Sequence, residues 1–400
     1  MMDLLLFGGL VLALGVIAGK ITRTLKLTSI VGYIAIGFLL GPLLGIVEKF
    51  EFSDGFSSLW GGWTHLTLAL VAFVIGAQLT FSLIRQLGRS VIGMLFAESM
   101  CATLAVIIGV TLFSGDLTLG LIFGAMAAAT DPVATVGVLH EYRSRGPLTN
   151  ALLTLVGWDD AIASTTVAVI SAIVIGILGG TTSIIGTVGI VFFRIFGGLA
   201  IGAALGVLLI FIVKHVRERD IIFISTLSII LLGAGVSELL DISLILTCMA
   251  IGIVFINFTP YRGGSVRSFI EEIMPPIYVF FFVLVGMQLD FGMVTAGWAL
   301  ALVYIISRMV GKYSGISMSA RILRAPKIFR KYLGFGMFSQ GALALGLMAL
   351  LGIRIESISP GSGLPVLGIT VITLTTIAFE IIGPIGVRYA IMKAGEAKRE

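Results

Sequence analysis

Residues 117–141 read LTLGLIFGAMAAATDPVATVGVLHE, an apolar run with Thr130, Asp131 and Pro132 near its middle. The run is long enough to cross a membrane, because a transmembrane helix needs about 20 apolar residues. Pro132 removes a backbone donor and clashes with the preceding turn, so we expect the helix to break there. A broken helix is tolerated inside a bilayer only where protein or a water-filled cavity surrounds it. The alternative is a simple kink that serves helix packing.

The composition of the whole chain is that of a membrane protein. Of its 400 residues, 58% are hydrophobic and 12% are charged, whereas soluble domains have about 25% charged residues. With 2 Cys the chain is not built on disulfides. We therefore predict an all-α polytopic membrane protein with about thirteen transmembrane helices and no soluble domain. The expected spans are 4–20, 28–46, 65–84, 90–113, 117–139, 148–177, 183–213, 221–238, 242–259, 270–289, 294–319, 329–353 and 363–387.

The basic residues indicate how the chain is oriented. The connections that follow odd-numbered spans, together with the C-terminal tail, hold most of the 26 Lys and Arg residues. Cytoplasmic loops are the ones enriched in these residues, so we expect the N-terminus outside and the C-terminus in the cytoplasm. Short loops and the lack of a targeting segment favour a cell (inner) membrane. The net charge of +5 then belongs to the cytoplasmic face and gives no reason to expect nucleic acid as a partner.

A second break is expected in span 329–353, where Ser339, Gln340 and Gly341 interrupt the apolar run. The first break lies in the fifth of the first six spans, and the second break lies in the fifth of the last six spans. Discontinuous helices at matching positions in two halves indicate the binding site of a transporter. Because the two halves start on opposite sides of the membrane, we predict inverted repeats. They cover about 1–177 and 221–387, joined by a linker helix at about 183–213.

Four charged residues fall in the central layer of the membrane, where each is costly and marks a functional site: Asp131, Asp159, Asp160 and Arg308. The two adjacent carboxylates repel each other in a low-dielectric site. One of them is therefore suited to exchange a proton for a hard cation, which oxygen ligands bind well. Arg308 is the expected partner of one acid and leaves the other to exchange. The alternative is a structural ion pair between Asp159 and Arg308.

Other polar residues within the spans are weaker candidates. We expect Lys312 to extend toward the cytoplasmic surface, and Arg194 either to pair with Glu98 or to brace the linker helix. Glu380 has no evident partner in the sequence. The secondary candidates for the site are Ser339, Gln340, Lys312 and Glu380.

The chain resembles the monovalent cation/proton antiporters, in the branch often called CPA2, over nearly all of its length. The paired Asp and the Thr-Asp-Pro segment are its most specific features. The resemblance rests on VGYIAIGFLLGP (31–42), LALVAFVIGAQLTF (68–81), ATDPVATVGVLHE (129–141), GWDDAIA (157–163), FFVLVGMQLDF (281–291) and SQGALALGL (339–347).

The resemblance implies a role for each matching residue. Asp160 corresponds to the carboxylate that binds ion and proton, and Asp159 to its neighbour in the electrogenic type of site. Arg308 corresponds to a Lys or Arg that pairs with the first acid. Thr130 and Asp131 correspond to residues that face the site from an unwound helix, where Asp131 compensates a helix dipole. The implied ligands of the monovalent cation are Asp160, Asp159 and Thr130.

The resemblance also implies an overall design, with two departures. The broken helices are expected to cross in a core domain that moves like an elevator beside a dimerisation domain, in a homodimer. Many relatives continue into a cytoplasmic nucleotide-binding domain, and none is expected here. Arg308 cannot lose its proton as a lysine can. Whether one or two protons exchange for each cation is therefore left open.

We predict a secondary antiporter that exchanges Na+ or Li+ for H+ and serves pH homeostasis. K+/H+ exchange on the same scaffold is the nearest alternative, followed by a solute symporter of related fold and a membrane sensor. The sequence contains no ATP-binding motif of the form G-x-x-x-x-G-K-[ST], so we do not expect a pump driven by ATP. An intramembrane aspartyl protease would need its two acids on separate helices in a GxGD-type motif, which this sequence does not have. We therefore expect no enzyme, and we expect no cofactor.

Overall fold

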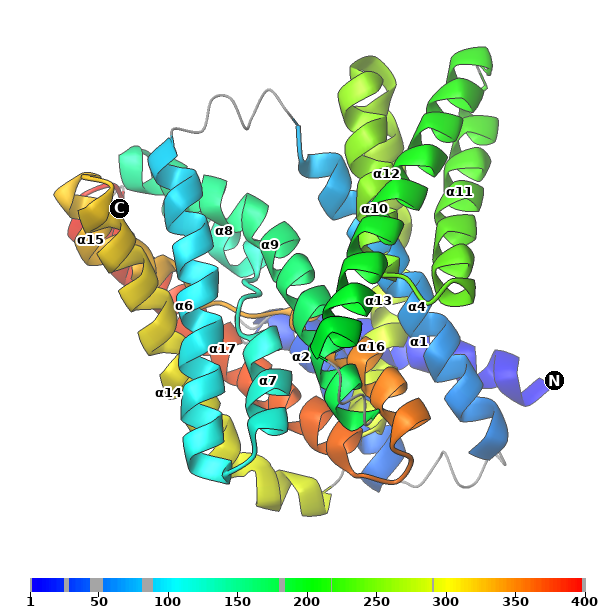
Figure 1. Ribbon diagram of the computed structural model, residues 1–400, viewed down its shortest axis with the longest axis horizontal. Helices are drawn as coiled ribbons and strands as arrows, with labels where there is room; N and C mark the ends of the chain where they lie inside the picture. Colours follow the sequence, from blue (N-terminus) through cyan, green and yellow to red (C-terminus); the bar gives the residue numbers. More distant parts are fainter. Residues whose placement is uncertain are drawn as a thin grey trace. The chain divides into compact units, whose positions relative to one another are not determined.

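The computed structural model of the protein describes residues 2–24, 29–43, 53–80, 89–179, 184–216, 218–289 and 291–397, and these contain helices but no strand (Figure 1). The all-α prediction is confirmed. The helices are α1 (Met2–Thr24), α2 (Ser29–Phe38), the π-helix η1 (Leu39–Leu43), α4 (Ser53–Gln78), α6 (Arg89–Ser114), α7 (Leu117–Met126), α8 (Pro132–Glu141), α9 (Pro147–Leu178), α10 (Ile184–His215), α11 (Arg219–Leu239), α12 (Leu244–Phe258), α13 (Pro260–Met287), α14 (Phe291–Ile322), α15 (Lys327–Tyr332), the 3-10 helix η2 (Leu333–Met337), α16 (Ala342–Ile358) and α17 (Leu364–Ala394).

Every expected span overlaps at least one of these helices, in keeping with about thirteen spans. Parts of the expected spans 28–46, 65–84 and 183–213 lie outside the described residues. Within the described part of the chain, 6 helices are long and apolar enough to cross a membrane by themselves. Six further apolar helices in that part of the chain are shorter, and one of them, Leu117–Met126, belongs to the first broken span.

The helices form two compact units. Unit 1 comprises Met1–Lys20, Gly32–Arg85 and Ser171–Met287, and unit 2 comprises Ile21–Val31, Gln86–Ile170 and Gln288–Glu400. Unit 1 thus holds most of α1 and α2 together with α4 and α10 to α13. Unit 2 holds α6 to α8, most of α9, and α14 to α17, including both predicted breaks.

Glycines bring helix backbones into contact in unit 1. A Cβ placed at Gly76 of α4 would lie 2.0 Å from the carbonyl oxygen of Met249 on α12, and one at Gly252 would lie 2.3 Å from that of Phe73. Small residues at such crossings allow the close packing on which membrane helix association depends. Close backbone contact is therefore one of the means by which the helices of unit 1 pack together.

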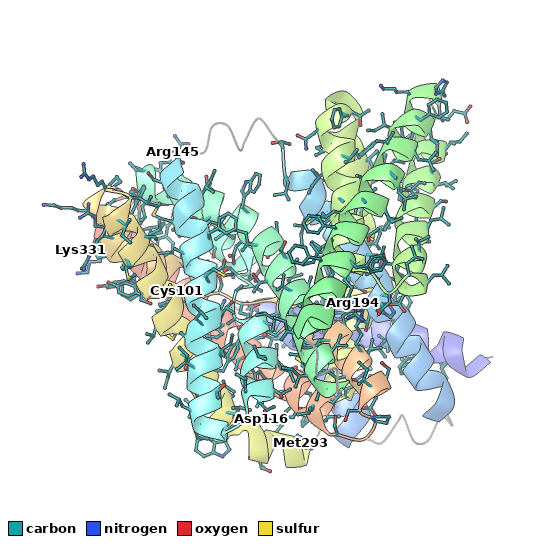
Figure 2. All side chains as sticks on the ribbon, viewed as in Figure 1. Cys101, Asp116, Arg145, Arg194, Met293 and Lys331 are labelled. Atoms are coloured by element: carbon teal, nitrogen blue, oxygen red, sulfur yellow. The ribbon has the colours of Figure 1, made fainter. Side chains whose placement is uncertain are left out.

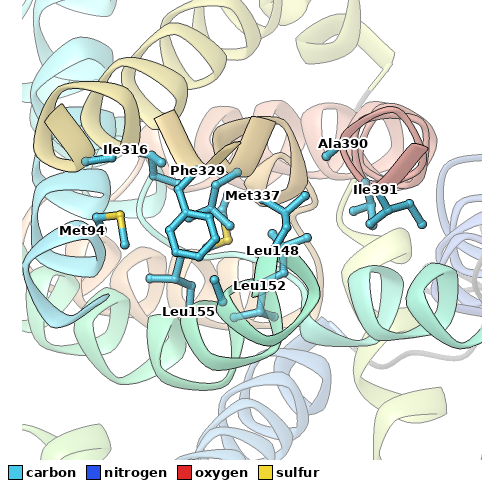
Figure 3. Close-up of a cluster of buried hydrophobic side chains, with 14 of the residues drawn as sticks. Met94, Leu148, Leu152, Leu155, Ile316, Phe329, Met337, Ala390 and Ile391 are labelled. Carbon is cyan, nitrogen blue, oxygen red and sulfur yellow. The ribbon is translucent and has the colours of Figure 1, made fainter. Parts of the chain in front are cut away.

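Unit 2 is organised around the pair α6 and α14, which pack along each other (Figure 1). Here too glycine permits the approach, since a Cβ at Gly315 would lie 2.8 Å from the Cα of Glu98. An apolar cluster fills the space that α6 and α14 share with α9, η2 and α17. Figure 3 shows Met94, Leu152, Ile316, Phe329 and Met337 within this cluster.

Both predicted breaks are confirmed. The first span is helical to Met126 and again from Pro132, and the second is helical to Met337 and again from Ala342. Pro132 starts α8, a position where its missing N–H costs nothing. The two non-helical segments meet, because the Asp131 N–H donates to the carbonyl oxygen of Ser339 at 3.3 Å. The Ser339 hydroxyl donates in return to the carbonyl oxygen of Asp131 at 3.1 Å.

The residues that follow α17 fix the start of α9, the helix that carries the two adjacent acids. The carboxylate of Glu396 accepts hydrogen bonds from the backbone N–H groups of Leu148 and Thr149, both at 2.8 Å. The Thr149 hydroxyl donates to the same carboxylate at 2.7 Å. Glu396 therefore caps α9 by satisfying N–H groups that have no partner within the helix.

Candidate functional site

Arg308 joins the two broken spans. It is buried on α14, and its guanidinium donates to four carbonyl oxygens. Two belong to the first break, Ala127 at 3.0 Å and Ala129 at 2.6 Å. The other two belong to the second break, Phe338 at 2.6 Å and Ser339 at 3.1 Å. These carbonyls follow the ends of α7 and η2, where a positive charge is favourable.

The predicted pairing of Asp159 with Arg308 is wrong. No ion pair joins these two side chains among the described residues, and the base nearest Asp159 is Lys312, one helical turn further along α14. The physical reason is geometric. A planar guanidinium presents several donors in a fork. Four buried carbonyl oxygens at two helix ends use that fork more fully than one carboxylate would.

Lys312 does not extend toward the surface as expected. Its side chain is buried, and its ammonium forms a hydrogen-bonded ion pair with Glu98 of α6. The same Nζ donates to the carbonyl oxygen of Ala128 and to the hydroxyl of Thr130, both at 2.8 Å. It lies 3.6 Å from Oδ2 of Asp159. Lys312 is thus the counter-ion of two buried acids.

Ser99 connects these two acids. Its hydroxyl oxygen lies 3.2 Å from Oε2 of Glu98 and 3.0 Å from Oδ1 of Asp159. We call Glu98, Ser99, Thr130, Asp159 and Lys312 the lysine cluster. All five side chains are buried. Ionised, the cluster holds two carboxylates against one ammonium and so carries an excess negative charge.

Asp160 lies beside the lysine cluster on α9. Its side chain is partly exposed, but its Oδ1 is buried and has no hydrogen-bond partner among the described residues. Successive helix residues point about 100° apart, so Asp160 faces a different direction from Asp159. A buried carboxylate oxygen without a donor is costly, and a proton or a hard cation would satisfy it. Among the described residues, no group of three His, Cys, Asp or Glu side chains forms a ready-made metal site.

Asp131 and Gly341 meet where the two breaks touch. Asp131 is buried, and a Cβ placed at Gly341 would lie 2.8 Å from the Cγ of Asp131. A side chain at position 341 would therefore displace this carboxylate. Asp131 precedes α8 and Gly341 precedes α16, so the carboxylate lies near the positive ends of both helices.

The remaining candidates surround the crossing. Gln340 donates through Nε2 to the hydroxyl of Tyr304 at 3.0 Å, and the Ser339 hydroxyl lies 2.9 Å from that of Thr135. Glu380 is buried on α17, next to Phe379, whose ring centroid lies 4.4 Å from the guanidinium carbon of Arg308.

Three features escaped sequence reasoning. Arg194 of α10, labelled in Figure 2, pairs with Asp241 and not with Glu98. Glu98 instead completes the lysine cluster, from the same helix as Cys101 (Figure 2). Tyr304 also faces the crossing, with Arg308 and Lys312 at successive steps of four residues. That spacing was the one available signal, because residues four apart share a helix face.

Comparison with known proteins places this geometry in a family. The sequence profile described as "Sodium/hydrogen exchanger, transmembrane" matches residues 9–388. The Na+/H+ antiporter NhaP of Pseudomonas aeruginosa is 26% identical over 208 residues, which are 49% of this chain and 48% of that protein. The chain thus matches about half the length of this relative. The ammonium/H+ antiporter subunit AmhT of Alkalihalophilus pseudofirmus is 24% identical over 284 residues, 68% of each protein.

Solved structures agree with the fold. The sodium/proton antiporter MjNhaP1 of Methanocaldococcus jannaschii at pH 8 superposes with a TM-score of 0.78 at 19% identity, covering 99% of both chains. An electron-microscopy structure of the same antiporter gives a TM-score of 0.72 at 18% identity, covering 100% of both chains. The predicted antiporter-like fold is confirmed. The chain belongs to the transmembrane sodium/hydrogen exchanger family, which consists of transporters and not enzymes.

Proposed function

We propose that the protein exchanges Na+ or Li+ for H+ across the membrane, with Asp160 as the carboxylate that binds proton and cation in competition. The observation that carries this proposal is the buried Oδ1 of Asp160, which has no hydrogen-bond partner among the described residues. It lies beside a cluster with excess negative charge. Such an oxygen is stabilised either by a proton or by a hard cation, and binding one displaces the other.

Asp159 and Thr130 are the next ligands of the cation in this proposal. Asp159 keeps one carboxylate oxygen, Oδ2, without a hydrogen bond among the described residues. The Thr130 hydroxyl oxygen accepts a hydrogen bond from Lys312 at 2.8 Å, which leaves it a second lone pair. Because the base beside Asp159 is a lysine, it can lose its proton, as an arginine cannot. Exchange of either one or two protons for each cation is compatible with this site.

Elevator-like alternating access is part of the proposal. It is supported by the location of the site, since Asp160, the lysine cluster, Arg308 and both breaks all belong to unit 2. The last three spans of each predicted repeat belong to unit 2, and the first three spans of each repeat belong to unit 1. Unit 2 therefore contains every residue of the proposed site. We also propose inverted repeats, which the matching division of the two predicted repeats between the units supports. A homodimer and a role in pH homeostasis are proposed from the family resemblance.

The cation is the least determined part of the proposal. The two relatives are named for different ions, sodium and ammonium. K+/H+ exchange is the alternative, and a solute symporter of the same general fold is a weaker one. The transport cycle needs no cofactor. We place the protein in a cell (inner) membrane with its N-terminus outside and its C-terminus in the cytoplasm, as the basic residues indicate.

The test uses purified protein in liposomes that contain a pH-sensitive dye. Na+, Li+ and K+ are added in turn to the wild type, to Asp160→Asn and to Asp241→Asn, which changes an acid of unit 1. We expect proton movement with Na+ or Li+, its loss in Asp160→Asn and its retention in Asp241→Asn. Movement with K+ alone would select the alternative cation. Silence with every cation, or full activity in Asp160→Asn, would overturn the proposal.

A further inference from the structure

We propose that Glu98 is a positioning residue that holds the ammonium of Lys312 away from Asp159. The Asp159 carboxylate then remains available, together with Asp160, to bind the transported cation. This inference rests on the proposed function and adds to it a residue from α6, a helix that contributes no member of the adjacent acid pair.

The hydrogen bonds of Lys312 carry the argument. An ammonium group has three N–H donors. They are directed to the carboxylate of Glu98, to the carbonyl oxygen of Ala128 and to the hydroxyl of Thr130. None is left for Asp159, whose nearest oxygen lies 3.6 Å away. The ammonium is thus near enough to attract Asp159 but is bonded elsewhere.

The hydrogen bonds of Asp159 agree with the finding that all three N–H donors of Lys312 are directed to other groups. Its Oδ1 lies 3.0 Å from the Ser99 hydroxyl, and its Oδ2 has no hydrogen bond among the described residues. Asp160 also has one buried oxygen without a partner in that part of the chain. Two neighbouring acids therefore each keep an oxygen for a ligand. Arg308 does not compete for either, since its contacts are with four carbonyl oxygens.

The backbone keeps Glu98 in this position. A Cβ placed at Gly315 would lie 2.8 Å from the Cα of Glu98, and one at Gly311 would lie 2.6 Å from the Cα of Ala102. The two glycines lie on either side of Lys312 on α14. Close packing of α6 against α14 therefore holds the carboxylate of Glu98 against the ammonium.

In Glu98→Gln the amide oxygen can still accept from Lys312, but without the negative charge it holds the ammonium less strongly, and Asp159 is the charged acid next to it. We expect that Lys312 then bonds Asp159 and withdraws it from the cation. The apparent KM for the cation should rise about tenfold in Glu98→Gln with a much smaller change in the maximal rate, which is the signature of lost ligand binding. Glu98→Asp, which keeps the charge, should lie close to the wild type.

Repulsion of the cation by an unneutralised Lys312 would also raise KM, and a double-mutant cycle separates the two causes. The apparent KM is measured for the wild type, Glu98→Gln, Asp159→Asn and the double variant in the same liposome assay. If Glu98 acts by freeing Asp159, the double variant has no higher KM than Asp159→Asn alone. Additive effects, or an unchanged KM in Glu98→Gln, would overturn the inference.

Transport by the wild-type protein shows whether a negative result contradicts this inference or the proposed function. If the wild type shows no cation-dependent proton movement, the proposed function fails. If it transports but the cycle is additive, only the role of Glu98 fails. Should Glu98→Gln not fold, the cycle is run with Ser99→Ala and Asp159→Asn. The Ser99 hydroxyl lies within hydrogen-bond distance of both carboxylates. Its loss should therefore raise KM in the Ser99→Ala single variant, but should not raise it further when Asp159→Asn is also present.

Discussion

The helices of both units pack through glycine contacts, but the two units differ in the polar side chains that they bury. In both, glycines let helix backbones touch, at Gly76 and Gly252 in unit 1 and at Gly311 and Gly315 in unit 2. The buried polar side chains described in unit 1 are all Ser or Thr. Every buried charged side chain among the described residues lies in unit 2, namely Glu98, Asp131, Asp159, Arg308, Lys312 and Glu380.

This difference separates what holds the helices together from what performs the chemistry. Close helix packing needs no buried charge, as unit 1 demonstrates. Buried ions in a membrane are costly, and even paired ones add little to stability. The charges of unit 2 are therefore best explained by two tasks that apolar residues cannot perform. Arg308 satisfies the carbonyl groups at the broken helices, and the acids form the binding site in our proposal.

The largest effect on stability is expected from the arginine of unit 2. Arg308→Met removes the donors from four buried carbonyl oxygens. Each buried group left unpaired costs about 1–3 kcal/mol, so we expect severe loss of folded protein. The matched change in unit 1 is Arg194→Met, which removes an ion pair with a largely exposed Asp241 and costs about 1 kcal/mol at most. Melting in detergent compares the two, and similar melting temperatures would refute this role of Arg308.

A smaller loss is expected at the glycine contact of unit 1. In Gly252→Ala the new Cβ would lie 2.3 Å from the carbonyl oxygen of Phe73, and overpacking of this kind costs about 1–3 kcal/mol. A Cβ placed at Gly235 of α11 would meet no described atom within 4 Å. Gly235→Ala should therefore be neutral or stabilising, by up to about 1 kcal/mol. Thermal unfolding of both variants checks this, and equal stability would show that α4 and α12 do not need the close approach.

The smallest of the three effects is expected at the cap of α9. Glu396→Ala removes an acceptor from two backbone N–H groups and the Thr149 hydroxyl, and loss of a cap costs about 0.5–2 kcal/mol. Lys393→Ala, at an exposed position of α17, should change stability by no more than about 0.5 kcal/mol. Hydrogen exchange at the start of α9 should quicken in the first variant only. Unchanged exchange there would mean that the cap is dispensable.

The sequence was sufficient for the outline of the site. Proline and glycine within apolar runs indicate breaks because their effect on the backbone is local. The depth of a residue in a span follows from its position, so Asp159, Asp160 and Arg308 could be placed in one layer. These inferences need no knowledge of which helices touch.

The pairing of the charges was not predictable in the same way. Arg308 and Lys312 lie one turn apart on the same face of α14, so their depth does not tell which one meets Asp159. The answer depends on the carbonyl groups exposed by the breaks, which take Arg308, and on the contact of α6 with α14, which brings Glu98 to Lys312. Glu396 was missed for a similar reason, since its cap joins distant parts of the chain.

The central claim is that a proton and a cation compete for Asp160. It is tested most directly by adding Na+, Li+ or K+ to purified protein in weakly buffered detergent solution and recording the pH. We expect the wild type and Asp241→Asn to release protons on addition of the transported cation, and Asp160→Asn to release none. Release from Asp160→Asn equal to that of the wild type, or no release from the wild type with any of the three cations, would contradict the account.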